Sequence, residues 1–261
     1  MGKPKDGETA SMRAIDHYAW TNRWRDRHPA EKLLPALALL LLTLILPPLT
    51  TGPLVLAGTT LTVVYGAGIP WKTLLSVLAA PAAFLLAGAP FLAISLDFSQ
   101  GFSLHISSEG MWLALSTTIR ALAAIGCLAF LTLTTPLADW IPLLRRVGIP
   151  AGLIELILLI YRLIFVFAER ALTGRRAQTA RLGYSRFDRG VRSAGLLAGN
   201  LFQRALEQAR RLDIGLAARG YTGELRVLTP ERPLSWPRLA VALAGVALIG
   251  LAGGLLARGS P

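Results

Sequence analysis

The chain has 261 residues, of which 53% are hydrophobic and only 16% are charged, and its formal net charge is +12. Soluble domains carry about 25% charged residues, so this composition argues against a soluble protein and favours a membrane protein. A single cysteine, Cys127, excludes a disulfide framework and a cysteine-based metal site.

The N-terminal segment is polar at first and then becomes aromatic and basic. Because Met1–Met12 has no apolar core, we expect no cleavable signal peptide. Residues Ile15–Lys32 combine two tryptophans, a tyrosine and several arginines just before the first apolar stretch. This mixture is typical of a segment at the membrane interface, and a solvated leader is the alternative.

Six apolar stretches follow, and we expect five of them to cross a membrane, since a spanning helix needs about 20 mostly apolar residues. The predicted spans are Leu33–Leu49, Leu54–Ile69, Thr73–Leu96, Met111–Thr134 and Leu239–Ala257. We expect a tight turn at Pro47–Pro53. Pro81 and Pro90 predict a kink or break in the third span.

The remaining stretch, Leu153–Ala168, is short and carries Glu155 and Arg162. Lys and Arg collect in cytoplasmic loops. With the N-terminus inside, the loops Pro47–Pro53 and Asp97–Gly110 lie outside, and neither contains Lys or Arg. A crossing at Leu153–Ala168 would place the arginine-rich segment that follows outside as well. We therefore predict a helix at the cytoplasmic surface that does not cross, with a crossing as the alternative.

Two further expectations follow from this topology. Leu137–Val147 is predicted to be a short amphipathic helix, ended by Gly148 and Pro150. The last span places the C-terminal tail outside. The predicted divisions are residues 1–135, with the interfacial segment and four spans, a cytoplasmic domain at 136–233, and the last span with its tail at 234–261.

Arg120 lies near the middle of the fourth predicted span. A charge at bilayer depth is costly and usually faces the interior of a helix bundle, so a functional role is one interpretation. The other is a structural arginine that reaches the interface or pairs with Asp97 or Glu109.

The basic segment Glu169–Gly223 contains two similar helix endings, Ala180-Arg181-Leu182-Gly183 and Ala218-Arg219-Gly220. In each, an arginine complements the helix dipole and a glycine follows, as is common where helices end. Between them, apolar residues recur at three- and four-residue spacing. This pattern predicts one amphipathic helix. We expect a helical hairpin that contacts another protein.

Several kinds of chemistry have no signal in the chain. There is no G-x-x-x-x-G-K-[ST] loop for ATP. The histidines, His17, His28 and His105, are far apart and share no helical spacing, so we expect neither a metal site nor a cofactor. No catalytic arrangement is visible, and we expect a protein that is not an enzyme.

The sequence resembles the CbiQ/EcfT family, the T components of energy-coupling-factor transporters, in its cobalt branch. The resemblance covers nearly the whole chain. It rests on the leader Asp16-His17-Tyr18-Ala19, Asn22-Arg23-Trp24-Arg25, His28-Pro29 and Lys32. It also rests on Leu143-Leu144-Arg145-Arg146-Val147-Gly148-Ile149-Pro150, Tyr161-Arg162, Glu169, Ala177-Gln178, Ala180-Arg181 and Ala217-Ala218-Arg219-Gly220-Tyr221.

The resemblance implies an all-α polytopic membrane protein with about five transmembrane helices and a cytoplasmic coupling-helix domain. It implies a non-catalytic scaffold in a bacterial inner membrane that joins two ABC-type ATPases to a substrate-capture subunit. Arg181 and Arg219 match the arginines that dock the ATPases. One departure concerns Leu182, which stands where the first motif would have glycine.

The resemblance implies a transition-metal ion as the substrate, with cobalt favoured and nickel as the nearest rival. A different class, a basic membrane-anchored protein that binds lipid or nucleic acid, is the second hypothesis. Nucleic acid is disfavoured because the hairpin has few aromatic residues for base stacking, namely Tyr184, Phe187, Phe202 and Tyr221. Membrane lipids are expected partners in either case.

Overall fold

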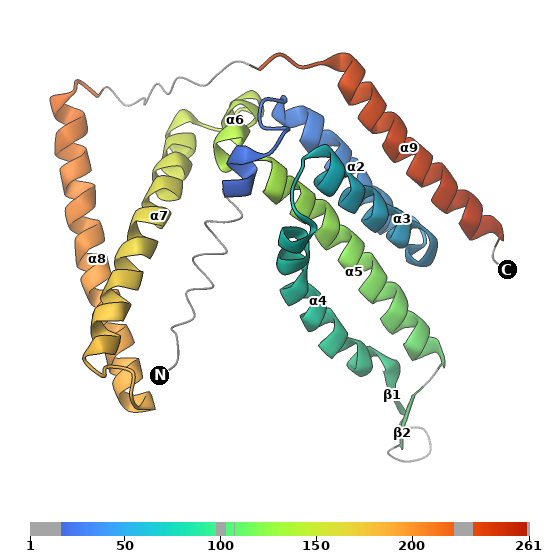
Figure 1. Cartoon of the computed structure of the whole chain (residues 1–261), viewed down its shortest axis with the longest axis horizontal. Coiled ribbons are helices and arrows are strands. Elements are labelled where there is room, and N and C mark those ends of the chain that lie inside the picture. The colour runs from blue at the N-terminus through green and yellow to red at the C-terminus, as the bar shows by residue number, and fades with distance from the viewer. Residues whose placement is uncertain (1–16, 98–102, 107, 222–231, 260–261) are drawn as a thin grey trace. The chain divides into compact units, whose positions relative to one another are not determined.

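The computed structural model describes residues 17–97, 103–106, 108–221 and 232–259, and these are almost entirely helical (Figure 1). The polar N-terminus up to Asp16 and the segment Thr222–Glu231 lie outside the described residues, as does the middle of the predicted outer loop. The chain divides into two compact units. One comprises Met1–Trp140 with Glu231–Pro261, and the other comprises Ile141–Pro230.

The first unit is a helix bundle. Its helices are α2 (Pro29–Ile45), α3 (Pro48–Leu61), α4 (Trp71–Ala93), α5 (Ser108–Thr134) and α9 (Trp236–Gly259). α5 packs against α2, α3 and α4, and α9 packs against α2 and α3. Small residues of α5 allow this close approach: a Cβ added at Gly126 would lie 3.1 Å from the side chain of Leu56 on α3.

The connection between α2 and α3 is shorter than predicted. Only Leu46 and Pro47 separate the helices, because Pro48 opens α3 with a φ that already suits a helix. Gly52 and Pro53, which we expected in a turn, lie inside α3. Gly52 lies against the side chain of Ile119 on α5, so this glycine serves helix packing. A π-helical turn, Thr62–Gly66, extends α3.

The third predicted span is one continuous helix. α4 runs through both Pro81 and Pro90, so the predicted break does not occur. It ends at Ala93, earlier than expected, because the chain then forms strand β1 (Ile94–Asp97). This strand pairs antiparallel with β2 (Ser103–Ile106), and the small hairpin is the exception to an otherwise all-α fold.

Among the described helices, five are long and apolar enough to cross a membrane. They are Pro48–Gly66, Trp71–Ala93, Ser108–Thr134, Ala151–Ala180 and Trp236–Arg258. The number equals the prediction, but the membership differs. The first predicted span is α2, a helix of only 17 residues, whereas Leu153–Ala168 is part of a 30-residue helix.

The second unit consists of α6 (Ile141–Arg146), α7 (Ala151–Ala180) and α8 (Phe187–Ala218). A 3₁₀ turn, Leu137–Trp140, precedes α6, and the two together match the predicted short helix. α6 ends at a turn in which Gly148 has a φ of +85°. The basic segment forms the predicted hairpin, with α7 and α8 side by side (Figure 1).

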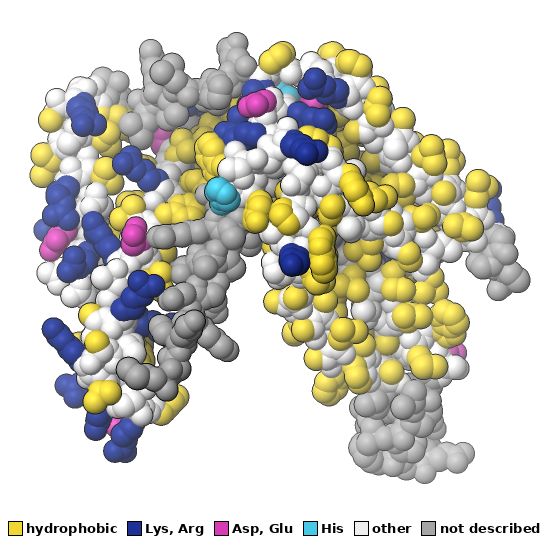
Figure 2. Space-filling view, in the orientation of Figure 1, with side chains coloured by type: hydrophobic (Ala, Val, Ile, Leu, Met, Phe, Trp, Pro, Cys, Tyr) yellow, Lys and Arg dark blue, Asp and Glu magenta, His cyan; other side chains and the backbone are white. Residues whose placement is uncertain are grey.

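The two units differ in the side chains that they expose. Figure 2 shows Lys and Arg side chains gathered over α7 and α8, whereas the visible face of the helix bundle is mostly hydrophobic. Large apolar side chains of the bundle are highly exposed, for example Phe84, Phe91 and Leu248. Apolar exposure on this scale is expected of a surface that faces lipid.

Candidate functional site

The first arginine motif closes α7. Arg181 is the C-cap residue, with a φ of −95°. The N–H of Leu182 donates to the carbonyl of Thr179 at 3.0 Å, and the N–H of Gly183 donates to the carbonyl of Gln178 at 2.8 Å. This pair of bonds is the Schellman motif, which satisfies the last carbonyls of a helix.

The second motif closes α8 in the same way. Arg219 is the C-cap residue and also has a φ of −95°. The N–H of Gly220 donates to the carbonyl of Ala217 at 3.1 Å, and the N–H of Tyr221 donates to the carbonyl of Leu216 at 3.0 Å. The two arginines therefore occupy equivalent positions in two equivalent helix endings.

The leucine in the first motif does not change the helix ending. Leu182 adopts the left-handed conformation, with a φ of +58°, and Gly220 does the same at +72°. A side chain in this conformation is unfavourable by about 1–2 kcal/mol. The bonds around Leu182 keep it there, so the departure from the family pattern affects local stability and leaves the geometry unchanged.

Both guanidinium groups are available to a partner. Arg181 and Arg219 are exposed, and within the described part of the chain neither side chain has a hydrogen bond or an ion pair. The neighbouring Ala180 and Ala218 are also exposed and add little bulk. A planar guanidinium beside a small residue is suited to directed hydrogen bonds with carboxylates or carbonyls of another protein.

A polar network stabilises the turn between α7 and α8, which carries Arg181 and is called the elbow here. The amide nitrogen of Gln178 donates to the carbonyl of Ser193 at 2.9 Å, and the hydroxyl of Ser193 donates to the carbonyl of Gly183 at 2.9 Å. The hydroxyl of Tyr184 donates to Oε1 of Gln178 at 2.8 Å. These bonds join the end of α7 to the second turn of α8. Of these residues, the family resemblance pointed only to Gln178 and Gly183.

A side-chain hydrogen bond also joins the two helices at the other end of the hairpin. The hydroxyl of Tyr221 donates to Oε2 of Glu155 at 2.8 Å, and Glu155 is buried in the first turns of α7. The end of α8 that carries Arg219 is therefore held to the beginning of α7. Sequence reasoning noted Glu155 only as a charge in an apolar stretch.

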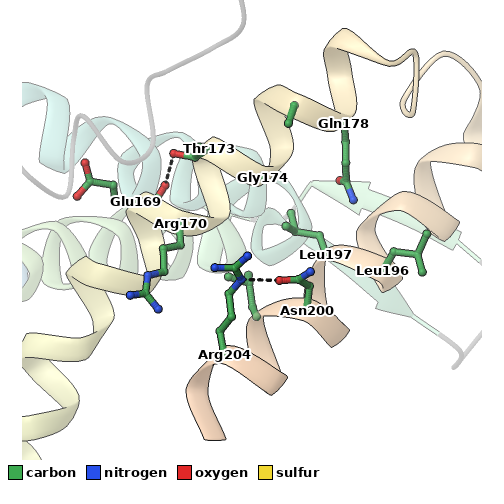
Figure 3. A pocket seen from close by; sticks show the side chains of 11 residues that line it. Glu169, Arg170, Thr173, Gly174, Gln178, Leu196, Leu197, Asn200 and Arg204 are labelled. Atoms are coloured by element: carbon green, nitrogen blue, oxygen red, sulfur yellow. Dashed lines mark hydrogen bonds between the residues drawn. The ribbon is translucent and has the colours of Figure 1, made fainter. Parts of the chain in front are cut away.

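Close to the elbow, α7 and α8 enclose a groove of about 530 Å³ (Figure 3). Gly174 faces Leu197 there, and a Cβ at Gly174 would collide with that leucine. Arg170 and Arg204 line the groove, and Nε of Arg204 donates to Asn200 at 2.7 Å. The glycine therefore allows the two helices to pack closely at this point.

Arg120 lies in the middle of α5 and is half-buried. Its Nε is buried and has no hydrogen-bond partner among the described residues. The structure describes no ion pair to Glu109, and the side chain of Asp97 lies outside the described ones. An unpartnered buried donor is unfavourable, so this position is a candidate contact for another membrane protein.

A buried charged cluster in the first unit was not predicted. Asp139 accepts hydrogen bonds from Arg25 at 2.8 Å and from Arg232 at 2.7 Å. Nearby, Nζ of the fully buried Lys32 donates to the carbonyl of Thr134 at 2.9 Å. Burial lowers the pKa of Lys32 to about 8, an effect that Asp139 opposes and Arg232 adds to. The cluster holds three distant segments together, and no local pattern marks it.

The aromatic and basic segment before α2 also packs against the helix bundle. Trp24 lies against Phe130, with ring centroids 6.0 Å apart, and a Cβ at Gly66 would lie 2.5 Å from its ring. Nδ1 of His28 accepts the N–H of Ala30 and so caps α2. Among the described residues, no three His, Cys, Asp or Glu side chains come together as a metal site requires.

Comparison with known proteins places these features in a family context. The family model described as cobalt transport protein matches residues 21–230. The chain is 39% identical to the cobalt transport protein CbiQ of Rhodobacter capsulatus, over 94% of this chain and 99% of that protein. It is 31% identical to the CbiQ of Salmonella typhimurium, over 83% of this chain and all of that protein. A fused cobalt transport protein of Methanocorpusculum labreanum, CbiMQ, is 35% identical over 49% of this chain and 22% of that protein.

Proposed function

Because this chain belongs to the cobalt transport protein family, we propose that it is the scaffold through which partner ATPases drive the uptake of a transition-metal ion. It is a membrane component of cobalt transport. In our proposal the chain hydrolyses no ATP. Its task is to couple the ATPases to a subunit that captures the metal.

The observation that carries this proposal is the pair of equivalent arginine endings. Arg181 and Arg219 are separated by α8, a helix of 32 residues, which is about 48 Å long at the usual rise. This spacing supports docking to two separate partner subunits. Each exposed guanidinium would bind in a groove of one ATPase, with charge-assisted hydrogen bonds.

Hydrogen bonds join the two helices of the hairpin near both of its ends, so a displacement of one helix would also move the other. The Gln178–Ser193 bond fixes α7 to α8 at the elbow, and the Tyr221–Glu155 bond fixes them at the other end. Two docking points on one braced pair of helices would move together when the ATPases close. The braced hairpin therefore supports a role as a lever.

We infer the capture subunit and the substrate from the relatives of this chain. The fused CbiMQ relative supports a partner component that acts together with a chain of this kind. In this proposal the half-buried Arg120 is the candidate contact with that component. The names of the relatives favour cobalt, and nickel is the rival substrate.

We place the chain in a bacterial inner membrane, with the N-terminus and the hairpin in the cytoplasm, because its arginines collect there. The test is Ser185→Cys, at the elbow, in intact cells. The one native cysteine, Cys127, is buried, so background labelling is low. We expect no labelling from outside. Labelling would mean that α7 crosses the membrane and would overturn this orientation.

The coupling proposal is tested by Arg181→Ala, Arg219→Ala and the double variant. Each replacement removes charge-assisted hydrogen bonds of about 1.5–3 kcal/mol. We expect each single variant to weaken co-purification of the ATPases and the double variant to abolish ATP-driven cobalt uptake in vesicles. Lysine should rescue poorly, since a point charge does not reproduce the planar fork.

The matched control is Arg192→Ala with Arg210→Ala, two exposed arginines within α8. This control should retain uptake, so that a loss of general basic charge is distinguished from loss of the helix-end arginines. Normal uptake in the Arg181/Arg219 double variant would refute the coupling role. Loss of that variant from the membrane would show that the two arginines are structural.

A further inference from the structure

A second cavity, of about 580 Å³, lies in the helix bundle between α2, α3 and α9. Its wall is largely apolar and includes two glycines. Leu39, Gly245, Val246 and Ile249 are among the lining residues. A Cβ added at Gly245 would meet nothing within 4 Å, so the space in front of this glycine is open.

Charged groups gather where α2 and α9 begin. Arg27 and Arg238 line this end of the cavity, and Arg27 also stacks on Trp24 at 4.2 Å. Burial, and then repulsion from Arg238, lower the pKa of Arg27, and the nearby Glu31 opposes this shift. Both guanidinium groups line the same end of the cavity, so an anion bound there would relieve the repulsion between them.

An acceptor lies beside the two cations. Glu31 is only 8% exposed and lines the same cavity. Its Oε1 accepts the N–H of Ser235 at 2.8 Å, but its Oε2 is buried and has no partner. The buried hydroxyl oxygen of Ser235 also lacks a partner. A carboxylate oxygen in this state requires a donor, and the described residues supply none.

The length of the cavity fits one membrane leaflet. Its lining runs from Glu31 to Leu39 on α2 and from Arg238 to Ile249 on α9, or about 12 and about 16 Å at the usual rise. Half of a hydrocarbon core of about 30 Å is about 15 Å. An apolar groove of this length, with charges at one end only, has the shape of a site for one lipid chain and its headgroup.

We propose that this groove binds a phospholipid with a primary-amine headgroup, of the phosphatidylethanolamine class. The phosphate accepts hydrogen bonds from Arg27 and Arg238, and the ammonium group donates to Oε2 of Glu31. One acyl chain lies along Leu39, Val246 and Ile249. The site thus matches a zwitterion with two cations and one anion.

The same groups discriminate among lipids. Phosphatidylglycerol offers the phosphate, but its headgroup has only neutral hydroxyl donors and no cation for Glu31. Phosphatidylcholine carries a positive charge but no N–H to donate to Oε2. A neutral hydroxyl makes a weaker hydrogen bond to a carboxylate than an ammonium group does, and a choline headgroup makes none. Both lipids should therefore bind less tightly than phosphatidylethanolamine.

The first test measures binding of the three lipids, with identical acyl chains, to the delipidated full-length chain by native mass spectrometry. We expect phosphatidylethanolamine to bind about tenfold more tightly than the other two, since about 1.4 kcal/mol is one factor of ten. Glu31→Gln keeps an oxygen for the Ser235 N–H and should abolish this preference. Equal binding of the three lipids by the native chain would overturn the proposal.

The double variant Arg27→Gln with Arg238→Gln should weaken the binding of phosphatidylethanolamine and of phosphatidylglycerol by about tenfold or more. The control is Arg258→Gln at the opposite end of α9, which should leave the binding of both lipids unchanged. If Arg258→Gln lowered binding as much as the double variant, the two arginines would act only as general positive charge, and the specific site would be refuted.

The second test does not require delipidation and measures the lipid that co-purifies with the chain from native membranes. Gly245→Leu fills the groove, and its control is Gly254→Leu on the same helix, outside the lining, where a Cβ would also meet nothing within 4 Å. We expect Gly245→Leu to retain several-fold less phosphatidylethanolamine than Gly254→Leu. Equal retention would show that the groove holds no lipid.

Discussion

The hydroxyl of Tyr221 donates a 2.8 Å hydrogen bond to Oε2 of Glu155, a residue 66 positions earlier in the chain. This bond joins the residue after the second arginine motif to the beginning of α7. Arg219 is therefore positioned by a contact across the hairpin as well as by the end of its own helix.

Replacing Tyr221 with Phe tests this brace. The phenol donates to a buried carboxylate, and a bond of this kind contributes about 1.5–3 kcal/mol. We expect faster hydrogen exchange at the amide of Tyr221, which closes α8 on the carbonyl of Leu216. Tyr65→Phe, at an exposed tyrosine of the other unit, is the control. Unchanged exchange would mean that the Schellman turn alone holds Arg219.

The two motifs should respond in opposite directions to a change at the left-handed position. Leu182→Gly removes a left-handed penalty of about 1–2 kcal/mol and adds a glycine entropy cost of about 0.5–1 kcal/mol, so the elbow should become more stable. Gly220→Ala should destabilise its turn by about 1 kcal/mol, purely through the backbone, since a Cβ there meets nothing within 4 Å.

Exchange rates at the amides of Gly183 and Tyr221 report these two turns. Leu182→Ala keeps the left-handed penalty and serves as the control for the loss of the exposed side chain. Equal effects of Ala and Gly at position 182 would contradict the conformational argument.

Arg120→Leu is expected to have opposite effects on the chain alone and on its assembly. Removing a buried donor that has no partner should stabilise the purified chain by about 1–3 kcal/mol. If Arg120 contacts the proposed capture subunit, the same change should weaken co-purification of that subunit. Thr117→Leu, at an exposed position of the same helix, controls for the added leucine. Stabilisation without any loss of assembly would assign Arg120 a purely local role.

Lys32 predicts a pH dependence. Its pKa is about 8 in the folded chain, below the ordinary 10.5, so the unfolded chain binds more protons between these values. This destabilising effect is present in full below pH 8 and disappears as the pH rises toward 10.5. Stability should therefore increase over this interval, by about 3 kcal/mol in all.

Thermal unfolding in detergent at a series of pH values measures this dependence. Lys32→Met should remove the increase, whereas Lys72→Met, at an exposed lysine of the same unit, should retain it. An identical pH profile in Lys32→Met and the native chain would show that other groups cause the dependence.

The sequence by itself predicted the features that depend on neighbouring residues. Apolar stretches of sufficient length predicted the helices of the bundle, and the glycines after Arg181 and Arg219 predicted where α7 and α8 end. These signals are local, because helix periodicity and capping involve residues only a few positions apart. The same reasoning misplaced Gly52, since the residue it packs against, Ile119, belongs to another helix.

The tertiary structure decided which distant residues meet. Asp139 joins Arg25 and Arg232, which lie 114 residues before it and 93 after it, and Tyr221 reaches Glu155 across the hairpin. The proposed lipid groove likewise combines Arg27, just before α2, and Glu31 of α2 with Arg238 of α9. A charged residue looks the same in sequence whether it is solvated or buried against a partner. The packing of the helices determines which of these charged groups is buried away from water and therefore needs a polar or charged partner.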